Sequence, residues 1–478
     1  MKPTVKKPGT KIIATVGPAC QQQDQLAALV TAGVDIFRVN MAHGRREQHE
    51  NIVQSIRAVS RQLHRPLGIL VDLSGPKIRL GQLAEEPTTC DDGQRFRFIR
   101  GDAARGADEL VSNYAPLIDE LSVGDVVMLA DGTVSIRVVE KSADSALGEV
   151  VESGLIRSRQ GINLPGVKLS VRALTDDDID CARWAAEAGV DFVGLSFVRR
   201  PEDIQQLQEL MREHGSLAMV VAKIEKQEAV NQLVDIVLAS DAVMIARGDL
   251  GVETDVAEMP VVQKRIIKVC NQLGKPVIVA TQMLDSMQRS RRPTRAEATD
   301  VANAILDGAD ACMLSGETAI GEYPQSTVEM MQRIISSTES AVHDVNAHEQ
   351  EGLAPQYVHP ITSAVVTGTA RVARQLNAAL MVVRTRSGAT ALAMSKLRHK
   401  IPTVAVSDNE QVLRQMCLLR GITPVADAPA LEGAGLREFI DDWGRRCAGL
   451  SAGDRVVMVS GTGIEPGAHN QIVVHEVN

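Results

Sequence analysis

Eight short runs of aliphatic and β-branched residues are the feature of this sequence that most restricts its fold. Most of these runs are nearly all apolar, which is typical of parallel strands that are buried on both faces. The runs occupy residues 11–16, 35–39, 67–72, 191–197, 218–224, 241–246, 276–281 and 310–314. The pattern predicts a parallel sheet that is covered by helices.

Helical segments separate most of these runs. They are expected at residues 22–32, 46–63, 176–188, 202–213, 258–273 and 295–307. Glycine often closes a helix just before a strand, as at Gly308. Thr294 and Glu297 have the spacing of a capping box at the start of the last helix. Eight strands that alternate with helices predict a TIM-type (β/α)8 barrel, with a doubly wound open sheet as the alternative.

The alternation of strand and helix breaks once, between the third and fourth runs. Short alternating strands without a long helical period are expected there, at residues 95–99, 125–130, 134–140 and 148–152. An insertion at the carboxyl end of a barrel strand lies over the face that carries the active site in barrel enzymes. We therefore expect an inserted all-β domain that acts as a lid and excludes water.

The last part of the chain predicts a separate α/β sandwich. A polar linker precedes it, followed by a helix at 361–376. Strands are then expected at residues 380–384, 403–406, 422–425, 455–460 and 471–477. The predicted domains are the barrel at 1–76 and 173–342, the lid at 77–172, the linker at 343–358 and the C-terminal domain at 359–478.

Composition excludes several classes of function. Seven cysteines without CxxC or CxxxC spacing predict free thiols in a reducing cytoplasm. A net charge of −9 and an aromatic content of 2% disfavour nucleic acid as a partner. No apolar run approaches the roughly 18 residues that span a bilayer, and the basic N-terminus lacks the apolar stretch of a signal peptide. We expect a cytoplasmic protein without a membrane partner.

Charged side chains gather where the fifth and sixth strands end. Lys223 and Glu225 are two residues apart and share one face of their strand, while Asp249 follows the next strand. Buried charges of this kind must be paired or bound to a metal ion. Two carboxylates without nearby His or Cys favour Mg²⁺ or Mn²⁺, with Lys223 directed at a phosphoryl group or an oxyanion. A structural Lys–Glu pair at the barrel rim is the alternative.

Polar residues follow other strands as well. Arg38 and Asn40 share a face at the end of the second strand, and arginine is suited to a phosphate contact. The segment Gly75-Pro76-Lys77 after the third strand predicts a hinge for the lid, and Thr281 places a hydroxyl after the seventh. Their structural alternatives are a solvated rim arginine, a plain domain boundary and a threonine that caps its own strand.

A second phosphate-binding pattern lies in the C-terminal domain. Thr385, Ser387 and Thr390 place hydroxyl groups between a strand and the N-terminus of a helix. Free amide groups at a helix start bind phosphate readily. Ordinary capping of the helix is the alternative.

Together these residues resemble the pyruvate kinase family over nearly the whole chain. The motifs that carry the resemblance are VVAKIEKQEAV at 220–230, MIARGDLGVE at 244–253, ATQM at 280–283, RPTRAE at 292–297 and DVANAILDGAD at 300–310. The resemblance implies transfer of the phosphoryl group of phosphoenolpyruvate to ADP, giving pyruvate and ATP. It also implies a (β/α)8 barrel with an inserted small β-barrel after strand 3, a C-terminal α/β domain and a homotetramer.

The resemblance further implies roles for individual residues. Lys223 would stabilise the phosphoryl group during transfer, Arg38 would grip the phosphate, and Glu225 and Asp249 would hold Mg²⁺. Thr281 would also lie near the proton path to the enolate carbon. The residues implied to orient the substrate carboxylate are Gly248, Asp249 and Thr281. The residues implied to contact the nucleotide are Asn40, His43 and Arg79, and those implied to bind an effector phosphate are Thr385, Ser387 and Thr390.

One departure from the family concerns a monovalent cation. Many members hold K⁺ with Asn, Ser, Asp and Thr, of which Asn40 and Asp72 remain here, while Ala42 and Leu73 carry no side-chain oxygen. Lys77 stands where the family usually has Glu, and lysine occupies this position in the K⁺-independent branch. The ammonium group could replace the missing K⁺ charge, so we predict activity without K⁺.

Two other departures concern nucleotide and effector. Gln160 stands where a family lysine faces ATP, and the neighbouring Arg159 is a candidate replacement. The loop from Ser460 to Asn470 carries Glu465 but no Arg, Lys or Trp, which is poor for the second phosphate of a bisphosphate. We therefore favour a sugar monophosphate or nucleotide monophosphate as the effector.

Two other functions compete with this interpretation. A Mg²⁺-dependent aldolase or lyase could use the same barrel on a pyruvate-like enolate, without a lid or nucleotide contacts. A Schiff-base aldolase would need Lys223 as a nucleophile, yet a lysine beside two carboxylates stays protonated. A metabolite-sensing scaffold with an inactive barrel is the non-enzymatic alternative, and the intact set of Lys223, Glu225, Asp249 and Thr281 argues against it.

Overall fold

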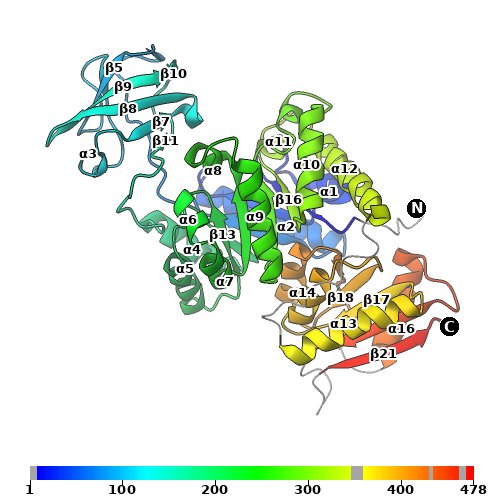
Figure 1. The fold of residues 1–478 in the computed structure, drawn as a ribbon. Helices are drawn as coiled ribbons and strands as arrows, with labels where there is room; N and C mark the ends of the chain where they lie inside the picture. The colour runs from blue at the N-terminus through cyan, green and yellow to red at the C-terminus, as the bar shows by residue number, and fades with distance from the viewer. Residues whose placement is uncertain (1–7, 346–358, 430–433, 462–469) are drawn as a thin grey trace.

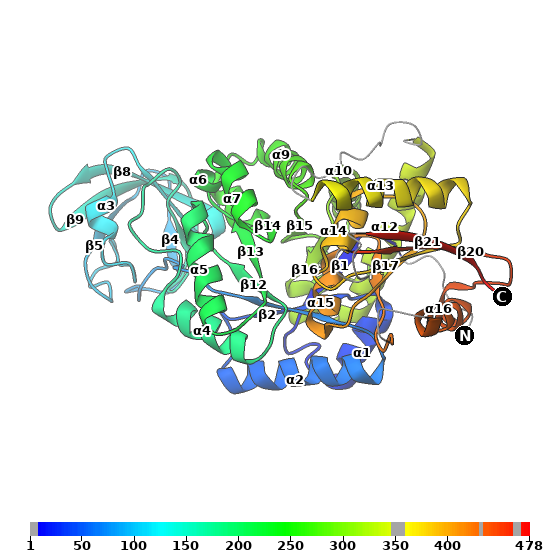
Figure 2. The same cartoon turned by 90° about the horizontal axis from the view of Figure 1, so that it is seen from below.

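The computed structural model describes residues 8–345, 359–429, 434–461 and 470–478. A β-rich unit and an α/β unit lie at opposite ends of a central barrel (Figures 1 and 2). The chain runs from the barrel into the β-rich unit and back before it enters the α/β unit. From residue 346 onward, the predicted linker lies outside the described residues.

The central unit is a closed barrel of eight parallel strands, which confirms the predicted (β/α)8 barrel and rules out the open sheet. Each predicted run forms one strand. The strands are β1 (Lys11–Thr15), β2 (Ile36–Asn40), β3 (Gly68–Asp72), β12 (Phe192–Leu195), β13 (Met219–Ile224), β14 (Ala242–Ala246), β15 (Val277–Ala280) and β16 (Ala311–Leu314).

Helices surround the barrel, and all six predicted helices are present. They are α1 (Gln23–Ala32), α2 (Arg46–Gln62), α4 (Asp176–Glu187), α5 (Pro201–Glu213), α9 (Met259–Gln272) and α10 (Arg295–Asp307). Thr294 and Glu297 form the predicted capping box, and Gly308 ends α10 in the left-handed conformation. Further helices were not predicted: α6 (Gln227–Asn231), α7 (Leu233–Ala239), α8 (Arg247–Glu253), α11 (Gly316–Ala319) and α12 (Pro324–Val345).

The insertion after β3 consists mainly of strands, as predicted. Its elements are β4 (Thr88–Cys90), β5 (Arg95–Ile99), β6 (Glu109–Leu110), α3 (Leu117–Glu120), β7 (Val126–Leu129), β8 (Val134–Lys141), β9 (Ser145–Glu152), β10 (Gly154–Ile156) and β11 (Ile162–Asn163). Six strands pair in the order β11-β7-β8-β9-β5-β6, and β10 pairs with β4. Phe96 and Phe98 are fully buried in a core of the insertion's own. We call this unit the lid.

The C-terminal unit is an α/β domain with a five-stranded sheet, as predicted. Its strands are β17 (Leu380–Arg384), β18 (Thr403–Val406), β19 (Ile422–Pro424), β20 (Arg455–Ser460) and β21 (Gln471–Glu476), in the order β19-β18-β17-β20-β21. Its helices are α13 (Pro360–Gln375), α14 (Ala389–Lys396), α15 (Glu410–Gln415) and α16 (Ala434–Trp443).

The C-terminal domain closes the amino end of the barrel. Cys417 and Leu418, just after α15, are buried in the same apolar cluster as Ile36, Phe192 and Val221 of the barrel strands. Apolar burial of this kind is the main favourable term in folding. The floor of the barrel therefore includes residues of a different domain.

Buried ion pairs reinforce this contact. Asp191, directly before β12, accepts hydrogen bonds from Arg57 of α2 at 2.9 Å and from Arg414 of α15 at 2.7 Å. Asp310, directly before β16, pairs with Lys396 at 2.7 Å and with Arg398 at 3.1 Å. Burial raises the pKa of the Asp310 carboxyl, but the two cations outweigh it and hold the pKa below its ordinary value. Asp310 is therefore a carboxylate in the folded protein.

All seven cysteines carry free thiols, as the sequence predicts. Within the described residues, none of the helices combines the length and the apolar character that crossing a membrane requires.

The Asp310 cluster yields a stability prediction. We expect Asp310→Ala to destabilise the protein by about 3–5 kcal/mol, because it leaves Lys396 and Arg398 without their buried counter-ion. Asp442→Ala is the matched control, since Asp442 forms an exposed pair with Arg445 and should change stability by less than about 1 kcal/mol. Urea denaturation followed by circular dichroism measures both. Equal midpoints for the two variants would contradict the assigned role of Asp310.

Candidate active site

Lys223 is the centre of a buried group of charges at the carboxyl end of the barrel. Its Nζ lies 2.9 Å from Glu225 Oε1 and 3.1 Å from Asp72 Oδ1, and it donates to Ser196 Oγ at 2.6 Å. The predicted proximity of Lys223 and Glu225 is therefore present. Asp72 and Ser196 were not predicted as partners of Lys223: Ser196 follows the neighbouring strand β12, and Asp72 ends β3, which the lid separates from β13 in the sequence.

Asp72 links Lys223 to Arg38. Arg38 Nη2 lies 2.6 Å from Asp72 Oδ2, and its Nη1 donates to Thr15 Oγ1 at 3.2 Å. Asn40 pairs with Asp72 across β2 and β3, and Arg38 lies two residues before Asn40 on the same face of β2. The strand register therefore brings Arg38 next to Asp72. The Arg38 side chain is only 12% exposed, so it is not a solvated rim arginine.

The charges in this group set one another's protonation. Burial alone lowers the pKa of the Lys223 ammonium group, but Asp72 and Glu225 outweigh it and the net pKa is raised above its ordinary value. Burial raises the pKa of Asp72, but Lys223 and Arg38 reverse this and hold it below its ordinary value. Lys223 is therefore a cation, and Asp72 an anion, at neutral pH.

Glu225 and Asp249 form the candidate metal site. Glu225 Oε2 accepts a hydrogen bond from Phe197 N at 2.7 Å, while its Oε1 faces Lys223. Burial raises the pKa of Glu225, Lys223 lowers it in part, and the negative charge of Asp249 raises it again. The two carboxylates repel each other, and the Asp249 side chain is 30% exposed. This pair fits a hard divalent cation that takes its remaining ligands from substrate and water.

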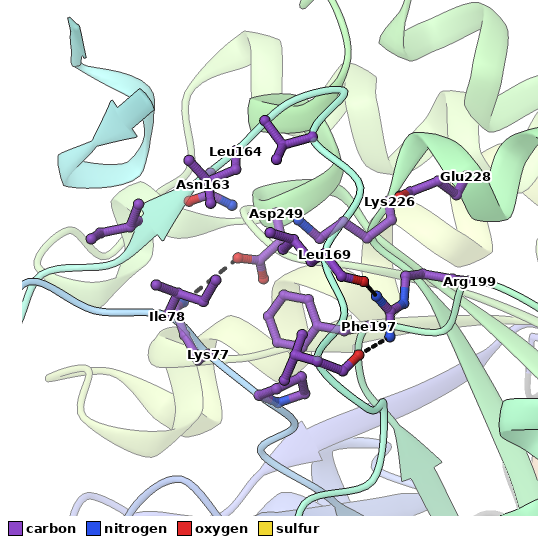
Figure 3. A pocket seen from close by; sticks show the side chains of 14 residues that line it. Lys77, Ile78, Asn163, Leu164, Leu169, Phe197, Arg199, Lys226, Glu228 and Asp249 are labelled. Atoms are coloured by element: carbon purple, nitrogen blue, oxygen red, sulfur yellow. Dashed lines mark hydrogen bonds and ion pairs between the residues drawn. The ribbon is translucent and has the colours of Figure 1, made fainter. Parts of the chain in front are cut away.

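Lys77 reaches this site from the lid connection. Its Nζ lies 3.6 Å from Asp249 Oδ1, and Figure 3 shows the two side chains directed toward each other. Both side chains are about one-third exposed, so a ligand can approach them. The sequence predicted a hinge at this position and a role for the Lys77 ammonium group. It did not predict that this group would reach Asp249.

Thr281 and Gly248 lie against each other beside this site. A side chain at position 248 would place its Cβ 2.9 Å from Thr281 Cγ2, so the close approach requires glycine. Thr281 has a φ of +74°, a strained value for a β-branched residue. Arg247 stabilises this backbone by donating to Thr281 O at 2.7 Å and pairing with Asp300 at 2.7 Å. Sequence analysis assigned no role to Arg247, although it lies within the recognised motif.

The lid packs tightly against the barrel next to these residues. Arg199 donates to the carbonyl oxygens of Leu169 and Val171 on the returning lid connection (Figure 3). On the barrel side of this contact, Lys226 forms a buried ion pair with Glu253 at 2.5 Å. The cavity between lid and barrel is only about 20 Å³, enough for about one water molecule.

The three predicted nucleotide contacts lie on two units. Asn40 is at the end of β2, where its Oδ1 accepts from Ala42 N at 3.2 Å, and His43 is exposed on the following loop. Arg79 is on the lid and lines a cavity of about 330 Å³ with Asn113 and Arg159. Arg79 Nη1 donates to Arg159 O at 3.1 Å.

Gln160 is engaged within the lid itself. Its Oε1 accepts a hydrogen bond from Arg157 N at 2.7 Å, which closes a tight turn. Arg159, by contrast, is exposed and has a φ of +66°, an uncommon conformation for a non-glycine residue. Arg159 lines the cavity beside Arg79, and Gln160 is not among its lining residues.

The predicted effector residues lie between β17 and α14. Thr385 Oγ1 accepts from Gly388 N at 3.0 Å, and Ser387 Oγ accepts from Ala389 N at 3.5 Å. The two hydroxyls therefore bond the backbone of the turn that leads into α14, and Thr390 is buried beside Gly461. Most of the predicted effector loop, from 462 to 469, lies outside the described residues.

The structure combines a closed barrel, a lid next to its carboxyl end and a buried cluster of lysine and carboxylates. These features are typical of a barrel enzyme that acts on charged substrates. Residues 7–328 match the family model "Pyruvate kinase, barrel domain", and residues 363–475 match "Pyruvate kinase, alpha/beta domain". The chain belongs to the pyruvate kinase family, whose members are phosphotransferases.

Individual relatives agree with this assignment along the whole chain. The pyruvate kinase of Corynebacterium glutamicum is 41% identical over 98% of this chain and 97% of its own length. That of Mycobacterium tuberculosis is 41% identical over 98% of both chains. The crystal structure of a pyruvate kinase from Cryptosporidium parvum has a TM-score of 0.91 at 32% identity, covering 99% of this chain and 97% of that one.

Proposed function

We propose that this protein transfers the phosphoryl group of phosphoenolpyruvate to ADP, forming pyruvate and ATP. The observation that carries the proposal is the Lys223 ammonium group, fixed between Asp72 and Glu225 at the carboxyl end of the barrel. A cation held in place before the reaction stabilises developing charge without reorganisation. Membership of the pyruvate kinase family gives the substrates.

Arg38 and Lys223 act together on the phosphoryl group. They lie on either side of Asp72, so the carboxylate orients two cations toward the same region. Phosphoryl transfer depends mainly on positioning and charge neutralisation. Glu225 and Asp249 would hold Mg²⁺ or Mn²⁺, which supplies charge stabilisation for the phosphate and the enolate oxygen when bound.

Gly248, Asp249 and Thr281 serve the substrate carboxylate in this proposal. Gly248 and Asp249 lie in the first turn of α8, where free backbone N–H groups point outward and can donate to an anion. The hydroxyl of Thr281 lies beside them and near the proton path to the enolate carbon. The competing Schiff-base aldolase is disfavoured, because Asp72 and Glu225 raise the pKa of Lys223 and a protonated lysine is not a nucleophile.

We further propose that Lys77 replaces a monovalent cation. Its ammonium group already lies next to Asp249, while the residues at positions 42 and 73 offer no side-chain oxygen for K⁺. A tethered charge carries no cost of binding from solution. The enzyme would then need only the divalent ion.

Turnover measured with and without K⁺ tests both proposals. Pyruvate formation from phosphoenolpyruvate, ADP and Mg²⁺ is followed through lactate dehydrogenase, in KCl or tetramethylammonium chloride at equal ionic strength. We expect comparable turnover in both salts. Turnover only in KCl would keep the enzyme and reject the role of Lys77. Absence of turnover in both would reject the proposed function.

We propose that Arg159, rather than Gln160, acts with Arg79 on the nucleotide phosphates. Gln160 is uncharged and held in a lid turn, whereas Arg159 and Arg79 line one cavity. Two guanidinium groups in one cavity suit the oxygens of a polyphosphate.

The test compares two neighbouring substitutions. Arg159→Ala should raise the KM for ADP about tenfold and leave the KM for phosphoenolpyruvate unchanged, because only nucleotide binding loses a charge-assisted contact. Gln160→Ala is the matched control and should change the KM for ADP less than about threefold. Equal effects of the two substitutions would contradict the assignment.

The effector would be a sugar monophosphate or nucleotide monophosphate bound near Thr385, Ser387 and Thr390. Ser387 is exposed at the helix start, while Thr385 and Thr390 are buried beside it, and the free N–H groups of the first turn of α14 suit a single phosphate group. Direct binding by calorimetry distinguishes such ligands from fructose 1,6-bisphosphate.

A further inference from the structure

Two stretches of chain connect the barrel to the lid, and one side chain holds both. The outgoing connection passes through Gly75 after β3, and the returning connection ends at Thr175 before α4. Asp178, in the first turn of α4, accepts from Gly75 N at 3.1 Å through Oδ1. Its Oδ2 accepts from Thr175 N at 3.1 Å and from Thr175 Oγ1 at 2.6 Å. Asp178 is 2% exposed, so water does not compete for these bonds.

Helix capping explains only half of this arrangement. The bonds between Asp178 and Thr175 form an ordinary capping box. The bond to Gly75 is additional and joins α4 to a segment about 100 residues earlier in the chain. Glu297 of α10 is the comparable residue elsewhere in the barrel. It forms the same capping box with Thr294, but its further bonds go to Ser286, which is not part of the lid.

The position of Gly75 matters because it packs directly on the catalytic region. Gly75 has a φ of +66°, and a Cβ there would lie 2.7 Å from Phe197 Cδ2 and 2.9 Å from Ser196 Cβ. Phe197 N donates to Glu225, and Ser196 Oγ accepts from Lys223. A shift of Gly75 therefore changes the residues that hold Glu225 and Lys223, as well as the path of Lys77.

We propose that Asp178 is a positioning residue that fixes both lid connections relative to each other and to the catalytic cluster. One carboxylate bonded to both connections keeps their spacing constant while the lid opens and closes. Lys77, two residues beyond Gly75, then returns to the same place beside Asp249 at each closure. The kinetic consequence rests on the proposed function, whereas the structural consequence does not.

The substitution Asp178→Asn separates this role from simple capping. The amide has the same shape as the carboxylate, but one of its two polar atoms donates instead of accepting. Two donors of Thr175 face one oxygen of Asp178 and a single donor of Gly75 faces the other, so the amide oxygen of the variant turns to Thr175 and the bond to Gly75 is lost. Glu297→Gln is the matched control, because it makes the same change in a capping box away from the lid.

Three measurements distinguish a positioning role of Asp178 from a role in protein stability alone. They are kcat and KM for both substrates, amide hydrogen exchange of the segment 73–77, and the thermal midpoint. We expect Asp178→Asn to lower kcat about tenfold, with smaller changes in the KM values, and to accelerate exchange in 73–77. Glu297→Gln should change neither kcat nor that exchange. Both variants should lower the thermal midpoint by similar amounts, because each turns one accepting oxygen of a multiply bonded carboxylate into a donor.

Wild-type kcat and unchanged exchange in Asp178→Asn would overturn the proposal. So would an equal loss of kcat in Glu297→Gln, because that would point to general destabilisation. If the wild-type protein forms no pyruvate, the proposed function fails, and the exchange comparison alone still decides whether Asp178 fixes the hinge.

Discussion

The ion pairs of Lys223 with Asp72 and Glu225 are the interaction on which the rest of this structure depends. Burying a lysine and two carboxylates is costly, and the cost is offset only if partners are held at hydrogen-bond distance. Lys223 comes from β13, Asp72 from β3 and Ser196 from the end of β12. The closed barrel brings these strand ends together, so the fold is what keeps the cluster charged and ordered.

Both ends of the barrel contribute to this order. At the amino end, the C-terminal domain places Cys417 and Leu418 under the barrel core and neutralises Asp191 and Asp310. At the carboxyl end, Arg199 and Asp178 tie the lid connections to the barrel. Both the floor of the barrel and the lid connections are therefore bonded to the barrel on either side of the Lys223 cluster. Lys77 is the lid-connection charge that reaches the catalytic face in this way.

The sequence predicted local features better than distant contacts. The eight strands and the Thr294–Glu297 capping box follow from hydrophobic pattern and spacing. The proximity of Lys223 and Glu225 follows from their positions two residues apart. The link between Asp72 and Lys223 could not be predicted, because β3 and β13 are separated in the sequence by the lid and lie on either side of β12 in the barrel. The bond between Asp178 and Gly75 also joins segments on either side of the lid insertion and could not be predicted, whereas the bond between Gln160 and Arg157 is a local turn contact that was not predicted.

In the proposed reaction, Lys223 remains a cation that acts on the phosphoryl group and moves no proton. This role is tested most directly by comparing phosphoryl transfer with deuteration of the pyruvate methyl group in D₂O, in wild type and in Lys223→Gln. We expect Lys223→Gln to lose phosphoryl transfer by about 10³-fold, while methyl deuteration, followed by proton NMR with Mg²⁺ present, falls less than about tenfold. Equal loss of both reactions, or retained phosphoryl transfer, would contradict this role.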